Sequence, residues 1–287
     1  MSSKLYADEL FGYKVVAFLG EGARSRLYAV KDRDSGNTYA LKHVIFDESR
    51  GDKDDRFLKQ VENEYNTLRH VSHRAIRKAI ALKRERPLVQ VTEVGLVLEM
   101  IDTATLEEEP PQLLRDYVRT FAEVAEGLAH IHEKGFAHAD MKTGNIMMPG
   151  EWGVLGTAKI IDLGQSCAIG TIKLRTQGSP GYMAPEQAAK HAITERTDVY
   201  NFGATMYRAL VRDHAETVLV PGTSKPRSVD TVPGTVHPVE RVAGLNRELS
   251  DLVMECLALE VERRPRSMEK IAQKLRALEQ TVANISI

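Results

Sequence analysis

The residues with the clearest capacity for chemistry lie in two short segments. His138 to Asn145 has the spacing H-x-D-x-K-x-x-N, and Asp162-Leu163-Gly164 follows further along the chain. Phosphoryl transfer from ATP needs a carboxylate near the attacking hydroxyl and hard oxygen ligands for Mg²⁺. We expect Asp140 to orient the hydroxyl and accept its proton, and Lys142 to neutralise charge on the phosphoryl group. Asn145 and Asp162 are the expected metal ligands. Each residue alone is more often an ordinary loop side chain, so the inference depends on the set.

A glycine-rich turn supplies a second, weaker signal. Gly20, Glu21 and Gly22 stand between two predicted strands, where glycine lets the backbone amides approach a polyphosphate. An ordinary hairpin turn has the same composition. Ser25 replaces the third glycine of the usual G-x-G-x-x-G pattern, which predicts weaker but not abolished phosphate contact.

The predicted elements that position these residues change in type along the chain. Strand and turn patterns dominate the first third, with one helix at 57–68 and a buried strand at 94–101. After Pro110, apolar residues at helical spacing predict helices near 117–131, 198–211, 252–259 and 271–278. The four prolines between 212 and 248 predict an irregular connection. This order predicts an α+β fold with two lobes joined near 99–102, and a ligand in the cleft between them.

Composition limits the other classes of function. The 287 residues include 39 Lys plus Arg and 40 Asp plus Glu, a net charge of −1. That balance predicts no nucleic-acid partner and no anionic membrane surface as partner. No apolar stretch approaches the ~20 residues of a membrane span. The two cysteines, Cys167 and Cys256, match no zinc or disulfide spacing, so we expect a reduced, cytoplasmic chain. The oligomeric state stays open.

Together these motifs resemble the protein kinase family from about Phe11 to Leu278. The resemblance implies the two-lobed α+β kinase fold, with ATP and Mg²⁺ as cofactors. Residues 1–101 would form an N-lobe of antiparallel sheet plus one helix. Residues 103–287 would form a mainly helical C-lobe, and the whole kinase domain would span about 11–280.

The resemblance also assigns nucleotide-binding roles. Lys42, in Tyr-Ala-Leu-Lys, would hold the ATP α- and β-phosphates and pair with Glu64, for which Glu62 is the rival. The hinge strand that bonds adenine would include Glu99 and Ile101. The residues that would sandwich adenine are Leu27, Ala40 and Met147.

A third motif, Gly178 to Glu186, is similar to the family's G-T-P-x-Y-M-A-P-E segment, which shapes a platform for a protein substrate. Glu186 would be buried against Arg264, and Asp198 would brace the catalytic loop. Lys142 and Ser179 resemble their counterparts in serine/threonine kinases, which implies protein substrates bearing serine or threonine.

The chain departs from the family at Ala139, where an arginine usually precedes the catalytic aspartate. That arginine normally meets a phosphate on the activation loop, so we expect a non-RD kinase with little need of loop phosphorylation. Candidate phosphorylation sites in the loop are Ser166, Thr171, Thr176 and Ser179.

Two alternatives remain at this point. A pseudokinase would keep the fold without catalysis, and a small-molecule kinase would share the fold core. The complete set of polar residues argues against the first, and the Ala-Pro-Glu segment with Arg264 argues against the second. The physiological substrate and the regulatory input stay open.

Overall fold

The computed structural model describes residues 7–22, 24–45, 52–85, 93–148, 157–215, 234–283 and 285–287, and the side chains of all of these except 52–55. The chain divides into two compact units, one of residues 1–72 with 77–102 and one of residues 73–76 with 103–287. The α+β class predicted from the sequence is confirmed. Ala23 of the glycine-rich turn and much of the irregular 212–248 connection lie outside the described residues.

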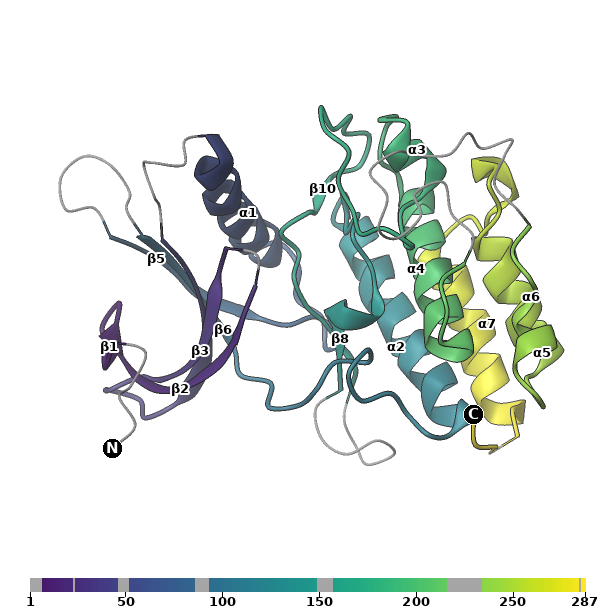
Figure 1. The fold of residues 1–287 in the computed structure, drawn as a ribbon, viewed down its shortest axis with the longest axis horizontal. Coiled ribbons are helices and arrows are strands. Elements are labelled where there is room, and N and C mark those ends of the chain that lie inside the picture. Colours follow the sequence, from purple (N-terminus) through teal and green to yellow (C-terminus); the bar gives the residue numbers. More distant parts are fainter. Residues whose placement is uncertain are drawn as a thin grey trace. The chain divides into compact units, whose positions relative to one another are not determined.

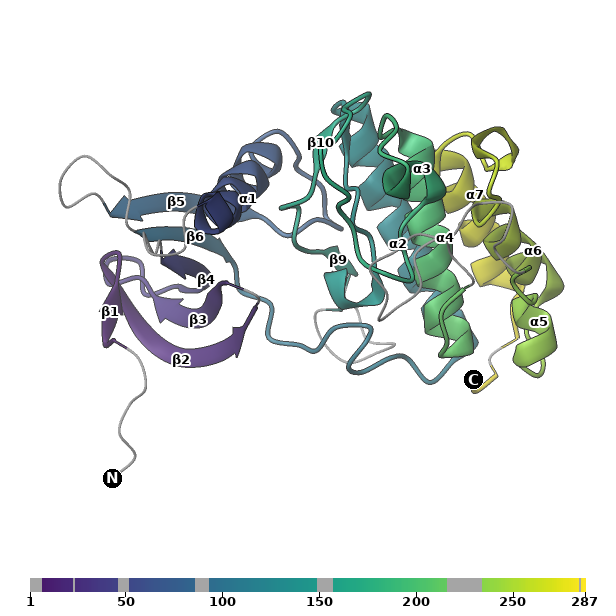
Figure 2. The ribbon, with the colours of Figure 1, turned by 45° about the horizontal axis from the view of Figure 1, so that its top comes forward.

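The first unit is a six-stranded antiparallel sheet with one helix, and Figures 1 and 2 show that the sheet is strongly curled. The strand order is β1-β2-β3-β4-β6-β5. The helix, α1 (Asp52–Leu68), packs on β5 and β6. The strands are β1 (Glu9–Leu10), β2 (Tyr13–Glu21), β3 (Arg26–Lys31), β4 (Thr38–Ile45), β5 (Ala79–Glu85) and β6 (Glu93–Glu99).

Alternation of buried and exposed side chains explains why these segments form strands. Tyr13 and Val15 in β2 are buried while their neighbours Lys14 and Val16 are exposed, as a half-buried strand requires. The turn between β3 and β4 is closed by the carboxylate of Asp32, which accepts hydrogen bonds from the amides of residues 34 and 35.

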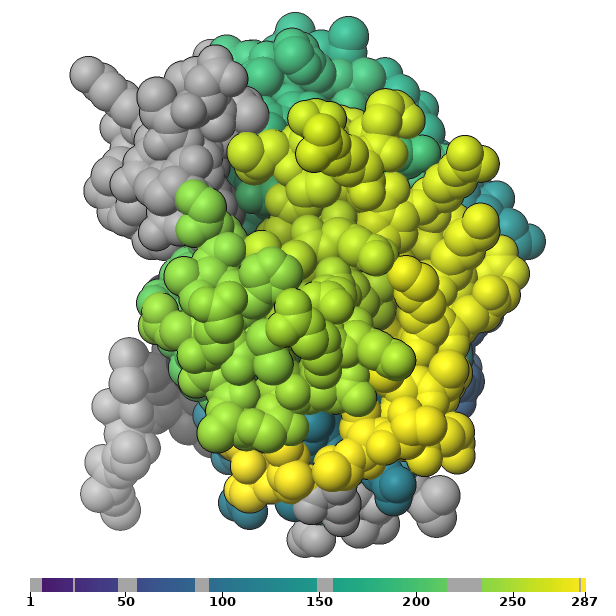
Figure 3. All heavy atoms as spheres, turned by 90° about the vertical axis from the view of Figure 1, so that its right-hand side faces the viewer, coloured from purple at the N-terminus to yellow at the C-terminus, as the bar shows by residue number. Residues whose placement is uncertain are grey.

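The second unit is mainly helical. Its helices are α2 (Leu114–Glu133), α3 (Pro185–Ala188), α4 (Glu195–Val211), α5 (Pro238–Arg241), α6 (Arg247–Cys256) and α7 (Met268–Thr281). Most residues of α4 are buried, and α2 and α6 both contact it. Figure 3 shows α6 and α7 side by side on one face of this unit. Within the described ranges, none of the helices has the length and apolar content that crossing a bilayer demands.

The helix predicted near 252–259 begins and ends earlier than expected. It runs from Arg247 to Cys256 because the side chain of Asn246 caps its first turn, accepting a hydrogen bond from the amide of Leu249 at 3.1 Å. The sequence pattern marked only the apolar residues and missed this polar start.

Two small antiparallel pairs frame the segment with the clearest chemical potential. β7 (Phe136–Ala137) pairs with β10 (Cys167–Ala168), and β8 (Ile146–Met147) pairs with β9 (Lys159–Ile160). Residues 138–145 connect β7 to β8, and Asp162 lies two residues beyond β9. The pairing therefore brings the two motifs of the second unit to the same end of these strands.

Candidate active site

A buried carboxylate on α4 fixes the backbone of the 138–145 loop. Asp198, which is fully buried, accepts hydrogen bonds of 2.7 Å from the amides of both His138 and Ala139. The imidazole of His132 on α2 donates to the same carboxylate at 2.8 Å. Burial alone would raise the pKa of Asp198, but the hydrogen bond and charge of His132 and the bonded amide hold it below the usual value. These bonds stabilise Ala139 in the left-handed region, at φ 61°.

The carboxylate of Asp140 projects from this fixed backbone and is only 7% exposed. The hydroxyl of Ser179 donates to it at 2.8 Å and accepts from the ammonium of Lys142 at 3.1 Å. That ammonium lies 3.8 Å from the second carboxylate oxygen. Burial raises the pKa of Asp140, and the charge of Asp162 acts in the same direction, against Lys142 and Ser179. A raised pKa makes this carboxylate a better proton acceptor at its fixed position.

Two further oxygen-bearing side chains lie beside this loop. The amide nitrogen of Asn145 donates to the carbonyl of Asp140 at 2.8 Å, so the remaining polar atom of the side chain is its oxygen. The carbonyl of Asn145 accepts from the amide of Ile161 at 2.9 Å, which holds the residue preceding Asp162 against the loop. Asp162 itself has a left-handed backbone, at φ 59°.

This donor set suits a hard cation such as Mg²⁺. Its ligands in proteins are commonly one or two carboxylates with water and phosphate oxygens, rather than a complete protein cage. The oxygens of Asn145 and Asp162 fit that description. Over the described residues, no three His, Cys, Asp or Glu side chains gather into a site for a metal ion.

In the first unit, the expected ion pair between Lys42 and Glu64 is formed. The ammonium of Lys42 on β4 lies 2.7 Å from the carboxylate of Glu64 on α1, which is only 2% exposed. The rival residue, Glu62, pairs instead with Arg84 on β5, at 2.9 Å. Lys42 is therefore held by a carboxylate from the helix.

Within the described residues, fewer contacts fix the glycine-rich turn than the 138–145 loop. Gly20 and Glu21 end β2 and pair with β3, and the amide of Gly22 donates to the carbonyl of Ser25 at 2.7 Å. A methyl group placed on Gly20 would meet nothing within 4 Å, whereas one on Gly22 would lie 2.9 Å from the hydroxyl of Ser25. Ser25 thus fills the space next to Gly22.

The expected hinge residues have partners of their own. The carbonyl of Glu99 accepts a hydrogen bond from the guanidinium of Arg77 at 2.9 Å, and its amide donates to the carbonyl of Lys78. Ile101, which ends this stretch of the first unit, is buried.

The three expected adenine-contacting residues belong to different units. Ala40 is fully buried on β4, and Leu27 is half-buried on β3. Met147 belongs to the second unit, where it lies half-buried on β8 and pairs with Thr105.

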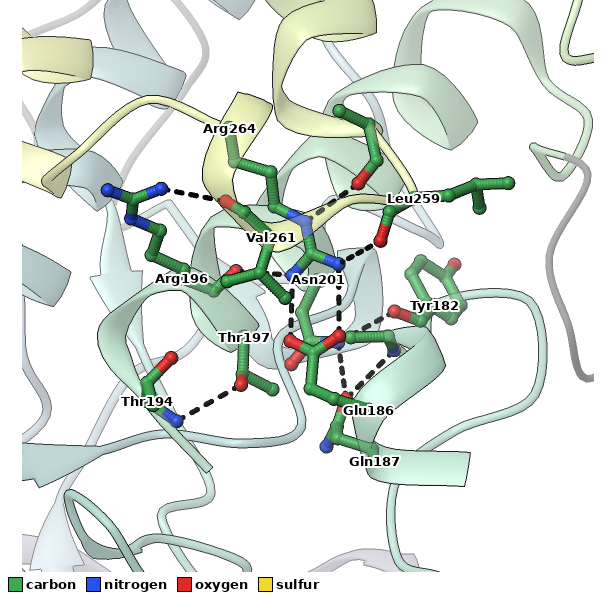
Figure 4. A network of polar contacts seen from close by, with 12 residues as sticks. Tyr182, Glu186, Gln187, Thr194, Arg196, Thr197, Asn201, Leu259, Val261 and Arg264 are labelled. Atoms are coloured by element: carbon green, nitrogen blue, oxygen red, sulfur yellow. Dashed lines mark hydrogen bonds and ion pairs between the residues drawn. The ribbon is translucent and has the colours of Figure 1, made fainter. Parts of the chain in front are cut away.

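Glu186 and Arg264 form the buried pair that the sequence led us to expect. Two hydrogen bonds, of 2.7 and 2.9 Å, join the guanidinium to the carboxylate, as Figure 4 shows. The remaining donor capacity of Arg264 goes to the carbonyls of Ala258, Arg196 and Leu259. The guanidinium also lies 4.9 Å from the ring centroid of Tyr200.

Gln187, next to Glu186, connects this buried pair to the loop, and sequence reasoning missed it. Its amide nitrogen donates to the carbonyl of Ala139 at 2.8 Å, and its oxygen accepts from Asn201 at 2.8 Å. Asn201 also donates to the carbonyl of Tyr182, as Figure 4 shows. The available signal was a polar residue, Asn201, amid the apolar residues of a helix that is buried almost all round.

A second polar network was also missed, because its members are far apart in the sequence. The hydroxyl of Thr143 contacts the hydroxyl of Tyr182 at 2.8 Å and donates to the carboxylate of Glu107. Arg208 on α4 donates to the other oxygen of Glu107 at 2.7 Å. This network links the loop that carries Asp140 to the Gly178–Glu186 segment.

Comparison with known proteins gives a consistent family. The family model described as "protein kinase domain" matches residues 13–275 of this chain. A DNA damage-responsive serine/threonine-protein kinase, RqkA, of Deinococcus radiodurans is 28% identical over 91% of this chain and 38% of the relative. Serine/threonine-protein kinase PknB of Mycobacterium tuberculosis is 26% identical over 88% of this chain and 40% of its own length. MAP3K epsilon protein kinase 2 of Arabidopsis thaliana is 29% identical over 67% of this chain. The chain thus spans well under half the length of these relatives.

Proposed function

The chain belongs to the protein kinase family, and from this we propose that it is a serine/threonine protein kinase that transfers the γ-phosphate of Mg-ATP to hydroxyls of protein substrates. The arrangement around Asp140 carries the proposal. A buried carboxylate of raised pKa, a lysine ammonium and a serine hydroxyl meet on a loop whose amides are fixed by Asp198. The names of the bacterial relatives support the substrate class.

Four polar residues of the second unit are each assigned one task in this reaction. Asp140 orients the substrate hydroxyl and accepts its proton as the oxygen bonds to the γ-phosphorus and the bond to ADP breaks. Lys142 neutralises charge on the transferring group, and Asn145 and Asp162 would hold Mg²⁺. Held there together with ATP, the metal would offset the negative charge of the phosphates.

We assign nucleotide binding mainly to the first unit, and we take residues 1–101 as the proposed N-lobe and residues 103–287 as the proposed C-lobe. Lys42, oriented by Glu64, would bind the α- and β-phosphates. The turn at Gly20, Glu21 and Gly22 would cover the phosphates. The adenine contacts would come from the hinge residues Glu99 and Ile101, and from Leu27, Ala40 and Met147.

The proposed kinase is of the non-RD type. The methyl group of Ala139 is fully buried in an apolar cluster with Ala137 and Ile193, to which Cys167 and Ile169 add. A buried methyl group offers no charge to a phosphate on the activation loop. Phosphatase treatment should therefore leave activity nearly unchanged, and loss of activity would contradict this assignment.

The four hydroxyls that the sequence offered for phosphorylation differ in exposure. Ser166 is buried and donates to the carbonyl of Leu163 at 2.6 Å, and Ser179 is bonded to Asp140. Thr171 donates to the carbonyl of Ala168 at 2.6 Å. Thr176 is exposed, so it is the proposed acceptor if this loop is modified at all.

The direct test is transfer of labelled phosphate from Mg-ATP to a generic basic protein, followed by phosphoamino-acid analysis. We expect phosphoserine or phosphothreonine, no product when the metal is chelated, and none with Asp140→Asn. Asp34→Asn, the same change on an exposed turn, is the matched control and should be active. No transfer by the unaltered protein would favour a pseudokinase. Transfer to sugars or antibiotics alone would favour a small-molecule kinase.

A further inference from the structure

The segment between Asp162 and Glu186 contains a stretch with inverted polarity. Ile172 and Leu174 are 64% and 91% exposed, while Lys173 between them is turned inward and partly buried. In an extended backbone, successive side chains point to opposite faces. Lysine is among the residues most rarely buried, so the outward position would ordinarily be its own.

Backbone pairing fixes which way Lys173 points. The amide of Gly170 donates to the carbonyl of Ile193 at 2.7 Å, and the amide of Ile193 donates to the carbonyl of Thr171 at 2.9 Å. Ile172 bridges Ala192 in the same antiparallel contact. The residues just before Lys173 are therefore held against the chain that leads into α4.

The ammonium of Lys173 reaches back toward the start of the segment. It donates a hydrogen bond to the carbonyl of Gln165, and it lies within electrostatic range of Asp140 and Asp198. Burial lowers the pKa of Lys173, while Cys167 and the two carboxylates act in the opposite direction. Burial of an ammonium is unfavourable unless hydrogen bonds and opposite charges offset it, and this position supplies both.

The two carboxylates whose charge acts on Lys173 are both connected to Ala139. Asp140 follows Ala139 in the chain, and Asp198 accepts the hydrogen bond from the amide of Ala139. The ammonium of Lys173 also interacts electrostatically with Cys167. Cys167 packs in the same cluster as the methyl group of Ala139. Lys173 of the 162–186 segment thus supplies a positive charge to the region of Ala139, a residue that carries no charge itself.

We infer that Lys173 is a positioning residue that ties the middle of the 162–186 segment to its start at Gln165, where the segment pairs with the strand leading into the loop of Asp140, so that the segment needs no phosphate to take its active arrangement. The inference rests on the proposed kinase function and deepens it. Ser179, which contacts Asp140, belongs to the same segment, so loosening the segment would disturb the substrate position without touching the nucleotide-binding unit.

The test compares Lys173→Met, which removes the charge and keeps the length, with Lys173→Arg, which keeps the charge. Arg175→Met is the matched control, because Arg175 is an exposed cation two residues away. The readouts are kcat, KM for ATP, thermal unfolding, and the rate at which an arginine-specific protease cleaves after Arg175 in the two Lys173 variants and the unaltered protein.

We expect Lys173→Met to lower kcat about ten-fold, with KM for ATP unchanged, and to speed cleavage after Arg175 by about ten-fold. Lys173→Arg should stay within about three-fold of the unaltered protein in both readouts, and Arg175→Met should keep its kcat. Unchanged kcat or unchanged cleavage in Lys173→Met would overturn the inference. So would equal losses of kcat and of thermal stability in both Lys173 variants, since that pattern indicates packing alone.

An unaltered protein that transfers no phosphate would overturn the proposed function instead. Cleavage after Arg175 would still report whether Lys173 holds the segment, so the two failures are distinguishable.

Discussion

The loop at 138–145 and the glycine-rich turn at 20–25 are both assigned to the phosphoryl-transfer reaction, yet they are held in opposite ways. In the loop, amides, a carbonyl and a side chain are bound by Asp198 of α4, by Ser179 and by Gln187 of α3. In the described part of the turn, the amide of Gly22 donates to the carbonyl of Ser25, and Glu21 and Gly22 are exposed where β2 ends. From this difference we expect the groups of the loop to be placed rigidly and the proposed phosphate contact of the turn to be adaptable.

The two regions also differ in how deeply their carboxylates are buried and how they are paired. Asp198 is fully buried with three hydrogen-bond donors around one carboxylate. Glu21 in the turn is mostly exposed and lies 3.5 Å from Arg26. An exposed pair of this kind contributes on the order of 0–1 kcal/mol, whereas breaking a buried pair costs about 3–5 kcal/mol.

The largest effect should come from the buried pair that supports the loop through Gln187. Arg264→Met leaves the carboxylate of Glu186 buried without its partner, so we expect the free energy of unfolding in urea to fall by about 3–5 kcal/mol. Arg263→Met, at an exposed neighbouring position, is the control and should stay within about 0.5 kcal/mol. A loss below about 1 kcal/mol in Arg264→Met would show that the rigid region does not extend this far.

A smaller effect is expected from Asp198→Asn, which removes the charge that binds two loop amides. We expect kcat to fall about 100-fold, because displacement of Asp140 disturbs the reacting geometry. The folded pKa of Asp198 lies below the ordinary value, so its ionised form stabilises the fold above about pH 4, and this contribution is lost as the pH falls through the folded pKa.

The measurement for Asp198 is unfolding of both proteins between pH 8 and pH 2. The stability difference between them should be constant above about pH 4 and shrink as the pH falls further. Asp34→Asn, the same change on an exposed turn, is the control for the substitution itself. A difference that grows on acidification would have the wrong sign for this account.

The smallest effect should come from the turn. In Gly22→Ala the added methyl group meets the hydroxyl of Ser25, the end of a side chain that can rotate away. We expect KM for ATP to change by less than about three-fold, with kcat unaltered, and the double variant with Ser25→Gly to return to the original KM. A large fall in kcat would contradict the comparison, because it would show that the turn tolerates displacement no better than the loop does.

Site residues could be predicted from the sequence where the interacting residues lie close together along the chain. Asp140, Lys142 and Asn145 lie within one short motif, so their spacing identified them directly. The pairing of Lys42 with Glu64 could be reached by counting from a neighbouring loop, with the family pattern as a guide.

Contacts made when distant segments fold back could not be read in this way. The inward turn of Lys173 depends on pairing between 170–172 and 192–193, and the bond from Gln187 to Ala139 depends on where α3 lies. Ser179 was recognised as a marker of substrate class, but its hydrogen bonds to Asp140 and Lys142 were not foreseen.

We propose that Asp140 of the rigid loop performs the chemistry, while binding of Mg-ATP depends mainly on other residues. Measuring ATP affinity and phosphate transfer on the same Asp140→Asn protein tests it most directly. The account predicts a Kd for Mg-ATP within about three-fold of the unaltered protein and a fall in kcat of about 10²–10⁴. Transfer at the original rate, or loss of ATP binding in step with loss of transfer, would contradict it.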